Sequence, residues 1–147
     1  MDLRKYGDTW YIRMDKGDEI IGTLLATAKK EHIDAAVFTG IGGCGEAEIQ
    51  TYIPEEQDFE TEKLTGMLEL VSLTGNLLMN ENGELMHHTH GLFTYKDADG
   101  THRTAGGHLK SVTVLYTAEI ELRPVRGGKI TKKYDPETKT GFWEFCE

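Results

Sequence analysis

A succession of strand-like segments is the feature that most constrains the fold of this chain. From residue 33 onward, apolar and polar residues alternate or form short apolar runs, separated by turn residues. The expected strands are residues 33–40, 46–53, 67–79, 85–95, 108–116 and 117–125. Apolar residues recur at helical spacing only over residues 18–31, where Asp18 is the expected N-cap. We therefore predict an α+β domain: a strongly twisted, mainly antiparallel sheet with one principal N-terminal helix.

The remaining segments extend this organisation without dividing it. Residues 8–13 alternate like a strand, and residues 134–143 place a Pro and Gly loop between aromatic residues, which indicates a terminal hairpin or an extended arm. The chain has 147 residues and no linker-like or repetitive stretch, so we predict a single domain over residues 1–147. No apolar run resembles a signal peptide or a membrane span, and Cys44 and Cys146 lack CxxC spacing. We expect a cytoplasmic protein with two reduced thiols.

Charge argues against a nucleic-acid partner. The formal net charge is −9, the wrong sign for neutralising phosphates. Residues 54–62 are strongly acidic, and the basic cluster lies near the C-terminus; its members are Arg123, Arg126, Lys129, Lys132 and Lys133. We interpret this cluster as a solvated face.

The glycine-rich segment GIGGCG at residues 40–45 formally matches GxGxxG. A dinucleotide site needs a helix to open at the last glycine, but residues 46–53 alternate like a strand. We reject a dinucleotide site and expect either a strand-to-strand turn or a close backbone approach at a subunit contact.

The histidines of HTHGLFTYKDADGTHRTAGGHLK are the strongest chemical signal. Residues i and i+2 of a strand share a face, so His88 and His90 present two imidazoles side by side. A third ligand, His108, would complete a set of the kind that open zinc sites use.

The loop at residues 97–100 leaves two registers open. A two-residue turn would place His108 on the face away from His90, whereas a three-residue loop with Gly100 in the left-handed conformation would place the two opposite each other. The spacing permits a three-histidine cluster without requiring it. We expect His32 and His102 to face solvent. Glu69, a charge within an apolar strand, is either exposed or paired, and it is our candidate for a proton-handling catalytic residue.

Several stretches together resemble the PPC ("plants and prokaryotes conserved") domain. They are KGDEI, VFTGIGGCGEAEI, LELVSLTGN, HTH, GGHL, TAEIEL and YDPETKTG, which extend over nearly the whole chain. The resemblance implies a compact sheet assembled as a homotrimer. In prokaryotic members it implies that His88, His90 and His108 bind a divalent metal, zinc being the expected ion.

DNA binding enters only through the family label, because no Arg-Gly-Arg AT-hook is found in this sequence. The fold and the histidine pattern are more distantly similar to those of acetolactate decarboxylase, a zinc lyase. The leading prediction is a metal-binding protein that acts as a binding or regulatory module. Its expected partners are other copies of the same chain, in a homotrimer, and a small-molecule ligand or another protein. The alternative is a zinc-dependent enzyme of the lyase or decarboxylase type.

Overall fold

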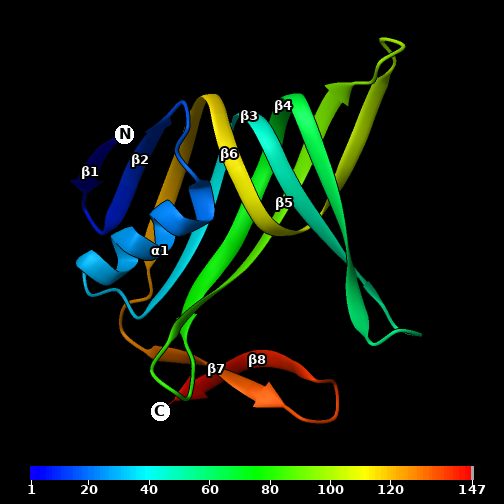
Figure 1. Ribbon diagram of the computed structural model, residues 1–147. Helices are drawn as coiled ribbons and strands as arrows, with labels where there is room; N and C mark the ends of the chain where they lie inside the picture. The colour runs from blue at the N-terminus through cyan, green and yellow to red at the C-terminus, as the bar shows by residue number, and fades with distance from the viewer. Residues whose placement is uncertain (147) are drawn as a thin grey trace.

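The computed structural model describes residues 1–146, and it confirms an antiparallel sheet with one helix (Figure 1). The strands and the helix follow in the order β1 (Asp2–Tyr6), β2 (Thr9–Asp15), α1 (Ile20–Lys30), β3 (Ala35–Ile53), β4 (Asp58–Met79), β5 (Leu85–Lys96), β6 (His102–Pro124), β7 (Lys129–Asp135) and β8 (Thr140–Cys146). Strand β1 was not expected from the sequence. The hairpin expected near the C-terminus is β7 and β8, which form a separate two-stranded sheet.

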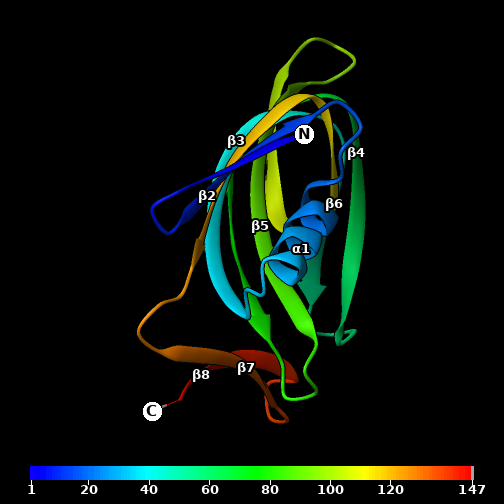
Figure 2. The same ribbon diagram turned by 90° about the vertical axis from the view of Figure 1, so that its left-hand side faces the viewer.

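The main sheet is closed because β6 pairs on both sides. Its six strands run in the order β1-β2-β6-β3-β4-β5, and β6 also pairs with β5. Strand β6 pairs with β5 over residues 102–108, with β3 over residues 108–124 and with β2 over residues 117–122. Strands of 19 to 23 residues bend around the core, as Figures 1 and 2 show. Bulges interrupt β3 against both neighbours, which increases twist and allows this curvature.

Strand alternation gives the sheet an apolar inner face. Leu68, Leu70, Leu73 and Leu77 of β4 are at most 2% exposed, and the residues between them face outward or are half-buried. Helix α1 lies on the inner side of the curved sheet (Figure 2) and buries its apolar stripe there. The outer face therefore remains available to polar and chemically active side chains.

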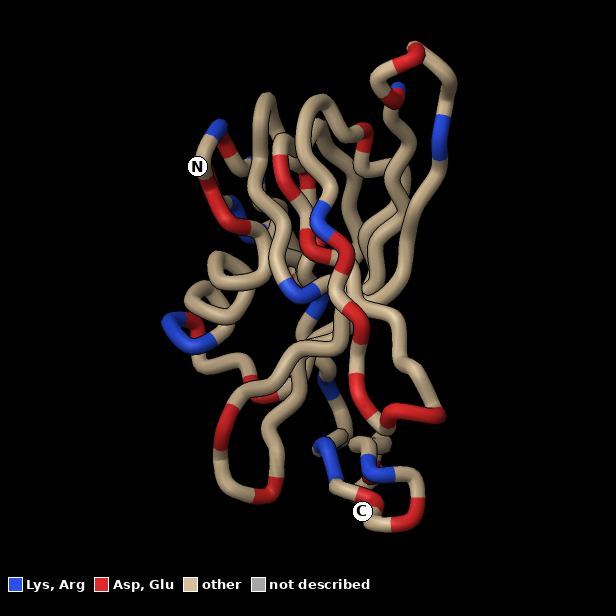
Figure 3. The backbone as a smooth tube through the Cα atoms, turned by 45° about the vertical axis from the view of Figure 1, so that its right-hand side comes forward, with Lys and Arg blue, Asp and Glu red and all other residues tan. Residues whose placement is uncertain are grey.

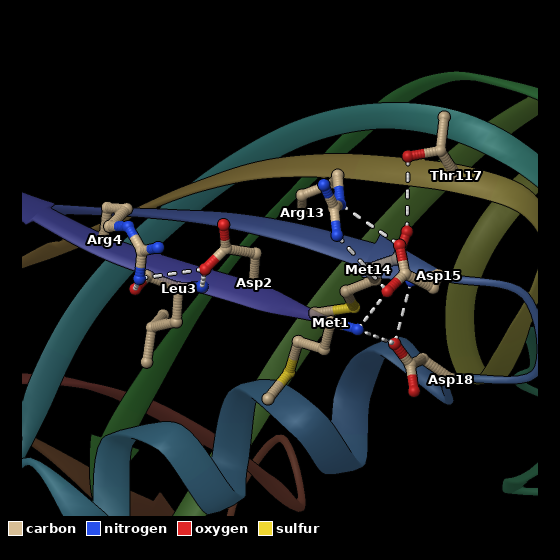
Figure 4. A network of polar contacts seen from close by, with 9 residues as sticks. All are labelled: Met1, Asp2, Leu3, Arg4, Arg13, Met14, Asp15, Asp18 and Thr117. Atoms are coloured by element: carbon tan, nitrogen blue, oxygen red, sulfur yellow. Dashed lines mark hydrogen bonds and ion pairs between the residues drawn. The ribbon is translucent and has the colours of Figure 1, made fainter.

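The helix begins one residue later than predicted. Glu19, not Asp18, is the N-cap: its carboxylate accepts hydrogen bonds from the backbone N–H groups of Ile21 (3.2 Å) and Gly22 (2.5 Å). The longer side chain also reaches the backbone N–H of Val112 on β6 at 3.1 Å, so one carboxylate anchors the helix to the sheet. Asp18 instead accepts a hydrogen bond from the backbone N–H of Asp15 (2.9 Å), within the network drawn in Figure 4.

That network holds the N-terminal strands against the start of the helix. The terminal amino group of Met1 contacts the carboxylate of Asp15 and lies 3.8 Å from that of Asp18. Arg13 also contacts Asp15 at 3.1 Å (Figure 4). These groups are largely solvent-exposed, so they orient the strand ends more than they stabilise the fold.

The glycine-rich segment is not a turn, which corrects one of the two expectations for it. Residues 40–45 lie inside the continuous strand β3, with bulges between Gly40 and Gly42 and between Cys44 and Glu46. The backbones do approach closely here, but within the chain: a Cβ on Gly42 would lie 2.7 Å from the carbonyl oxygen of Thr117 on β6. The expected approach at a subunit contact stays a prediction. The strand stays continuous through these glycines because the bulges accommodate the extra residues and bend the strand without a turn.

No helix among the described residues is long and apolar enough to cross a membrane.

Candidate metal centre

The β5–β6 loop selects the three-residue register. The backbone N–H of Asp97 donates to the carbonyl of Thr101 (3.0 Å), and Gly100 adopts a φ of +76°, the left-handed conformation that such a loop requires. The Asp97 carboxylate also accepts from the backbone N–H of Thr101 (2.9 Å) and from Arg103 (2.7 Å). This loop pairs His90 directly with His108. Of the two registers that the sequence left open, the structure has the one that brings the histidines together.

The three imidazoles form one cluster on the outer face of the sheet. One ligand atom from each of His88, His90 and His108 can be chosen so that all three lie within 4.8 Å of one another. The Nε2 atoms of His88 and His90 are 3.2 Å apart, and the ring centroid of His108 lies 4.9 Å from His88 and 4.4 Å from His90. His88 and His90 are exposed and His108 is half-buried, so the cluster is open to solvent on one side.

Neighbouring groups favour neutral imidazoles. Partial burial lowers the pKa of His88 and of His108, and the positive field of the other histidines and of Lys132 lowers both further. The ring of Phe59 packs edge-on against His108 with centroids 5.5 Å apart and contributes to the partial burial of that imidazole. Neutral imidazole is the form that binds a metal, so these surroundings prepare the cluster for ligation.

The donor set fits a divalent transition metal. Zinc binds imidazole nitrogen at about 2.0–2.1 Å, so two nitrogens of a tetrahedral site stand about 3.3 Å apart. The observed 3.2 Å between the Nε2 atoms of His88 and His90 meets this value, and a ring nitrogen of His108 lies within 4.8 Å of a ring nitrogen of each. Three histidines leave one coordination position for another ligand.

A groove opens beside the cluster. It is open to solvent and has a volume of about 330 Å³. Its lining includes His88 and His90, the polar side chains of Thr74 and Asn76, and Arg123 and Trp143. We call this space the histidine groove. Strand β4 contributes to it because Thr74 pairs with His90 and Asn76 with His88.

Arg123 and Trp143 are among the groove residues that were not identified as site residues from the sequence. Arg123 was interpreted as part of a solvated basic face, and Trp143 as an aromatic of the terminal hairpin. The basic cluster was the sequence signal that could have identified Arg123 as a groove residue. No local pattern could have placed Trp143 in the groove, because β8 belongs to a separate two-stranded sheet that reaches the main sheet through tertiary packing.

The remaining candidates lie elsewhere. His102 pairs with Lys96 near the exposed loop, and His32 follows the helix with a φ of 53°; both are exposed, as expected. His87 points to the opposite face of β5, where its Nδ1 lies 3.1 Å from the hydroxyl of the buried Thr89. Glu69 is exposed and lines a different outer groove with Met67. It stands five residues before Thr74 on β4, about 17 Å away at strand spacing, so the structure does not bring it to the histidines.

A closed antiparallel sheet with three clustered histidines on its outer face defines a class of protein, and comparison with known proteins identifies the family. Residues 1–125 match the model of the Plants and Prokaryotes Conserved (PCC) domain, the family also abbreviated PPC. The chain belongs to this family. No curated protein matches the chain significantly.

Solved structures support the same assignment. A PPC protein from Pyrococcus horikoshii is 30% identical, with a TM-score of 0.79 over 99% of this chain and 95% of that one. A metal-containing protein from Archaeoglobus fulgidus is 26% identical, with a TM-score of 0.81 over 98% and 99% of the two chains. A candidate DNA-binding protein from Ralstonia eutropha JMP134 is also 26% identical, with a TM-score of 0.85 over 98% and 96%.

The expected similarity to acetolactate decarboxylase is confirmed at the level of the fold. A Staphylococcus aureus protein of unknown function, described as similar to α-acetolactate decarboxylase, aligns with a TM-score of 0.56 and 13% identity over 86% of this chain and 54% of that one.

Proposed function

We propose that this protein is a homotrimeric metal-binding module that holds one divalent ion per chain, zinc being the expected ion, through His88, His90 and His108. The observation that carries the proposal is the convergence of three imidazoles within 4.8 Å. Similarity to the metal-containing protein of Archaeoglobus fulgidus supports it. A bound divalent ion would supply Lewis-acid polarisation of a ligand oxygen, while the chain's own groove residues would orient that ligand.

Metal analysis of untagged protein, purified anaerobically, tests the proposal. We expect about one equivalent of a divalent transition metal per chain. His108→Ala should abolish high-affinity zinc binding, because the remaining pair lacks the third donor. His102→Ala is the matched control, since this histidine lies on the same strand but outside the cluster, and its zinc affinity should equal that of the wild type. Wild-type affinity in His108→Ala would refute the site.

The trimer is supported by an apolar area on the outer face, which no element of the described chain covers. Ile41 and Tyr116 are 55% and 67% exposed, and Met67 and Val71 beside them are 41% and 48% exposed. These four side chains line one outer groove with Glu69. An exposed apolar cluster of this kind is typical of a protein–protein contact. Light scattering after size exclusion should give three times the chain mass, and a monomer at micromolar concentration would contradict the trimer.

A metal-dependent enzyme of the lyase or decarboxylase type is the second candidate, favoured by the histidine groove beside the cluster. The groove is open to solvent, and its volume of about 330 Å³ is in the range of small-molecule sites. Release of carbon dioxide from acetolactate by the metal-loaded protein, lost in His108→Ala, would support this candidate. Absence of turnover with intact metal binding would leave the binding module as the function.

A further inference from the structure

The register of the sheet places an arginine in line with the histidine cluster. Arg123 on β6 pairs with Val37 on β3, Val37 pairs with Asn76 on β4, and Asn76 pairs with His88 on β5. Residues paired in this way share a face, and three strand spacings separate the first Cα from the last by about 14 Å. The guanidinium and imidazole side chains therefore approach the groove from opposite ends and leave room between them for a small molecule.

The Arg123 guanidinium is available to bind a ligand. The ion pairs found among residues 1–146 engage Arg4, Arg13 and Arg103, but not Arg123. Glu121, two residues earlier on the same face, lines a different outer groove instead. In a chain with a net charge of −9, Arg123 thus presents a cation that has no ion-pair partner among residues 1–146, and it lies beside a cluster suited to bind a metal cation. This arrangement is complementary to an anion.

The rest of the lining suits a small organic acid. Trp143 offers an aromatic surface, while Thr74 and Asn76 offer hydrogen-bonding groups between the two ends. The planar fork of an arginine matches a carboxylate through two parallel hydrogen bonds. Sites for phosphate groups commonly add a helix N-terminus or a row of backbone N–H groups, whereas helix α1 contributes nothing to this groove.

We propose that the histidine groove binds a small organic carboxylate, with Arg123 holding the carboxylate and a second oxygen of the ligand directed toward the histidine cluster. This inference rests on the proposed metal site and adds the chemical class of its ligand. Arg123 is the specificity-determining residue, and Trp143 packs against the carbon skeleton.

Cobalt(II)-loaded protein provides the test, because its visible spectrum reports changes in coordination without requiring turnover. The probe is pyruvate, and its neutral amide is the matched control ligand. Pyruvate should change the spectrum with saturation, while the amide binds at least about tenfold more weakly because it lacks the charge that Arg123 recognises.

Arg123→Gln should weaken pyruvate binding about 10- to 150-fold, the range expected for losing a hydrogen bond to a charged group, while cobalt affinity stays unchanged. Arg126→Gln is the matched control variant, since Arg126 lies three residues further on and lines another groove; it should bind pyruvate like the wild type. If Arg123→Gln does not fold, Arg123→Lys decides: it keeps the charge without the fork and should still bind several-fold more weakly.

Three results would overturn the inference while leaving the metal site intact: no spectral change with pyruvate, Arg123→Gln binding within about twofold of the wild type, or inorganic phosphate binding about tenfold more tightly than pyruvate. Loss of cobalt from Arg123→Gln would also overturn it, because the arginine would then act on the metal site. A wild-type protein that binds no cobalt would refute the proposed function itself.

Discussion

Gly75 links the fold to the metal centre, and its replacement by alanine is the sharpest test of the packing described above. The residue lies in β4 between Thr74 and Asn76, the two positions that pair with His90 and His88. A Cβ at this position would stand 2.4 Å from Cζ of Phe38 and 2.5 Å from the carbonyl oxygen of His88. Phe38 is 2% exposed, so its ring has little space to yield.

We expect Gly75→Ala to destabilise the protein by about 1–3 kcal/mol, the usual cost of forcing an extra methyl group into a packed interior. The smaller conformational freedom of alanine in the unfolded chain offsets only about 0.4–1 kcal/mol of this. For a chain of this size the net loss lowers the melting temperature by several degrees, about 2–4 °C per kcal/mol. Because the clash moves the backbone of His88, zinc affinity should fall as well.

Thermal unfolding by circular dichroism and zinc titration of the same samples measure both effects. Gly128→Ala is the matched control, since a Cβ there meets no atom within 4 Å; its stability should equal or slightly exceed that of the wild type. An equal melting temperature for Gly75→Ala and Gly128→Ala would refute the reasoning.

Three further predictions concern titration, thiol reactivity and DNA. The pKa values of His88 and His108 are lowered, so these rings stay neutral to a pH below about 6.5, where an unperturbed histidine titrates. Zinc should therefore be released with a midpoint below that pH in a fluorescent-chelator assay. Release above that pH would contradict the environment described. Without metal, the contribution of these two histidines to the free energy of unfolding should be fully present above about pH 6.5. It should decline as pH falls, because the histidines of the unfolded chain take up protons at a higher pH than those of the folded chain. Burial raises the pKa of Cys44 to about 12, with Glu69 adding to the effect, so a thiol reagent at pH 8 should modify only the half-buried Cys146 in native protein and both thiols in denaturant. Figure 3 shows that acidic positions separate the basic positions along the backbone. Duplex DNA should therefore bind with a Kd no lower than about 10⁻⁴–10⁻⁶ M at physiological salt. Sub-micromolar, sequence-specific binding in a fluorescence anisotropy titration would contradict this.

The sequence by itself determined the local features of this protein. Strand alternation is a property of neighbouring residues, so it was enough to place His88 and His90 on one face and to predict a largely antiparallel sheet with a single N-terminal helix. It also excluded a dinucleotide site, because residues 46–53 form part of a strand. The motifs that resemble the PPC domain predicted the family that the comparisons then showed.

Only the tertiary structure decided how distant segments meet. The loop at residues 97–100 could form two registers, and the choice between them depends on pairing energies along residues 90–96 of β5 and 102–108 of β6. The continuity of β3 through its glycines depends on bulges against two neighbouring strands. Arg123 and Trp143 reach the histidine groove from β6 and from the separate β7–β8 hairpin. Such contacts arise from sheet curvature and the closure of β6 onto both β5 and β3, and no local pattern in the sequence encodes them.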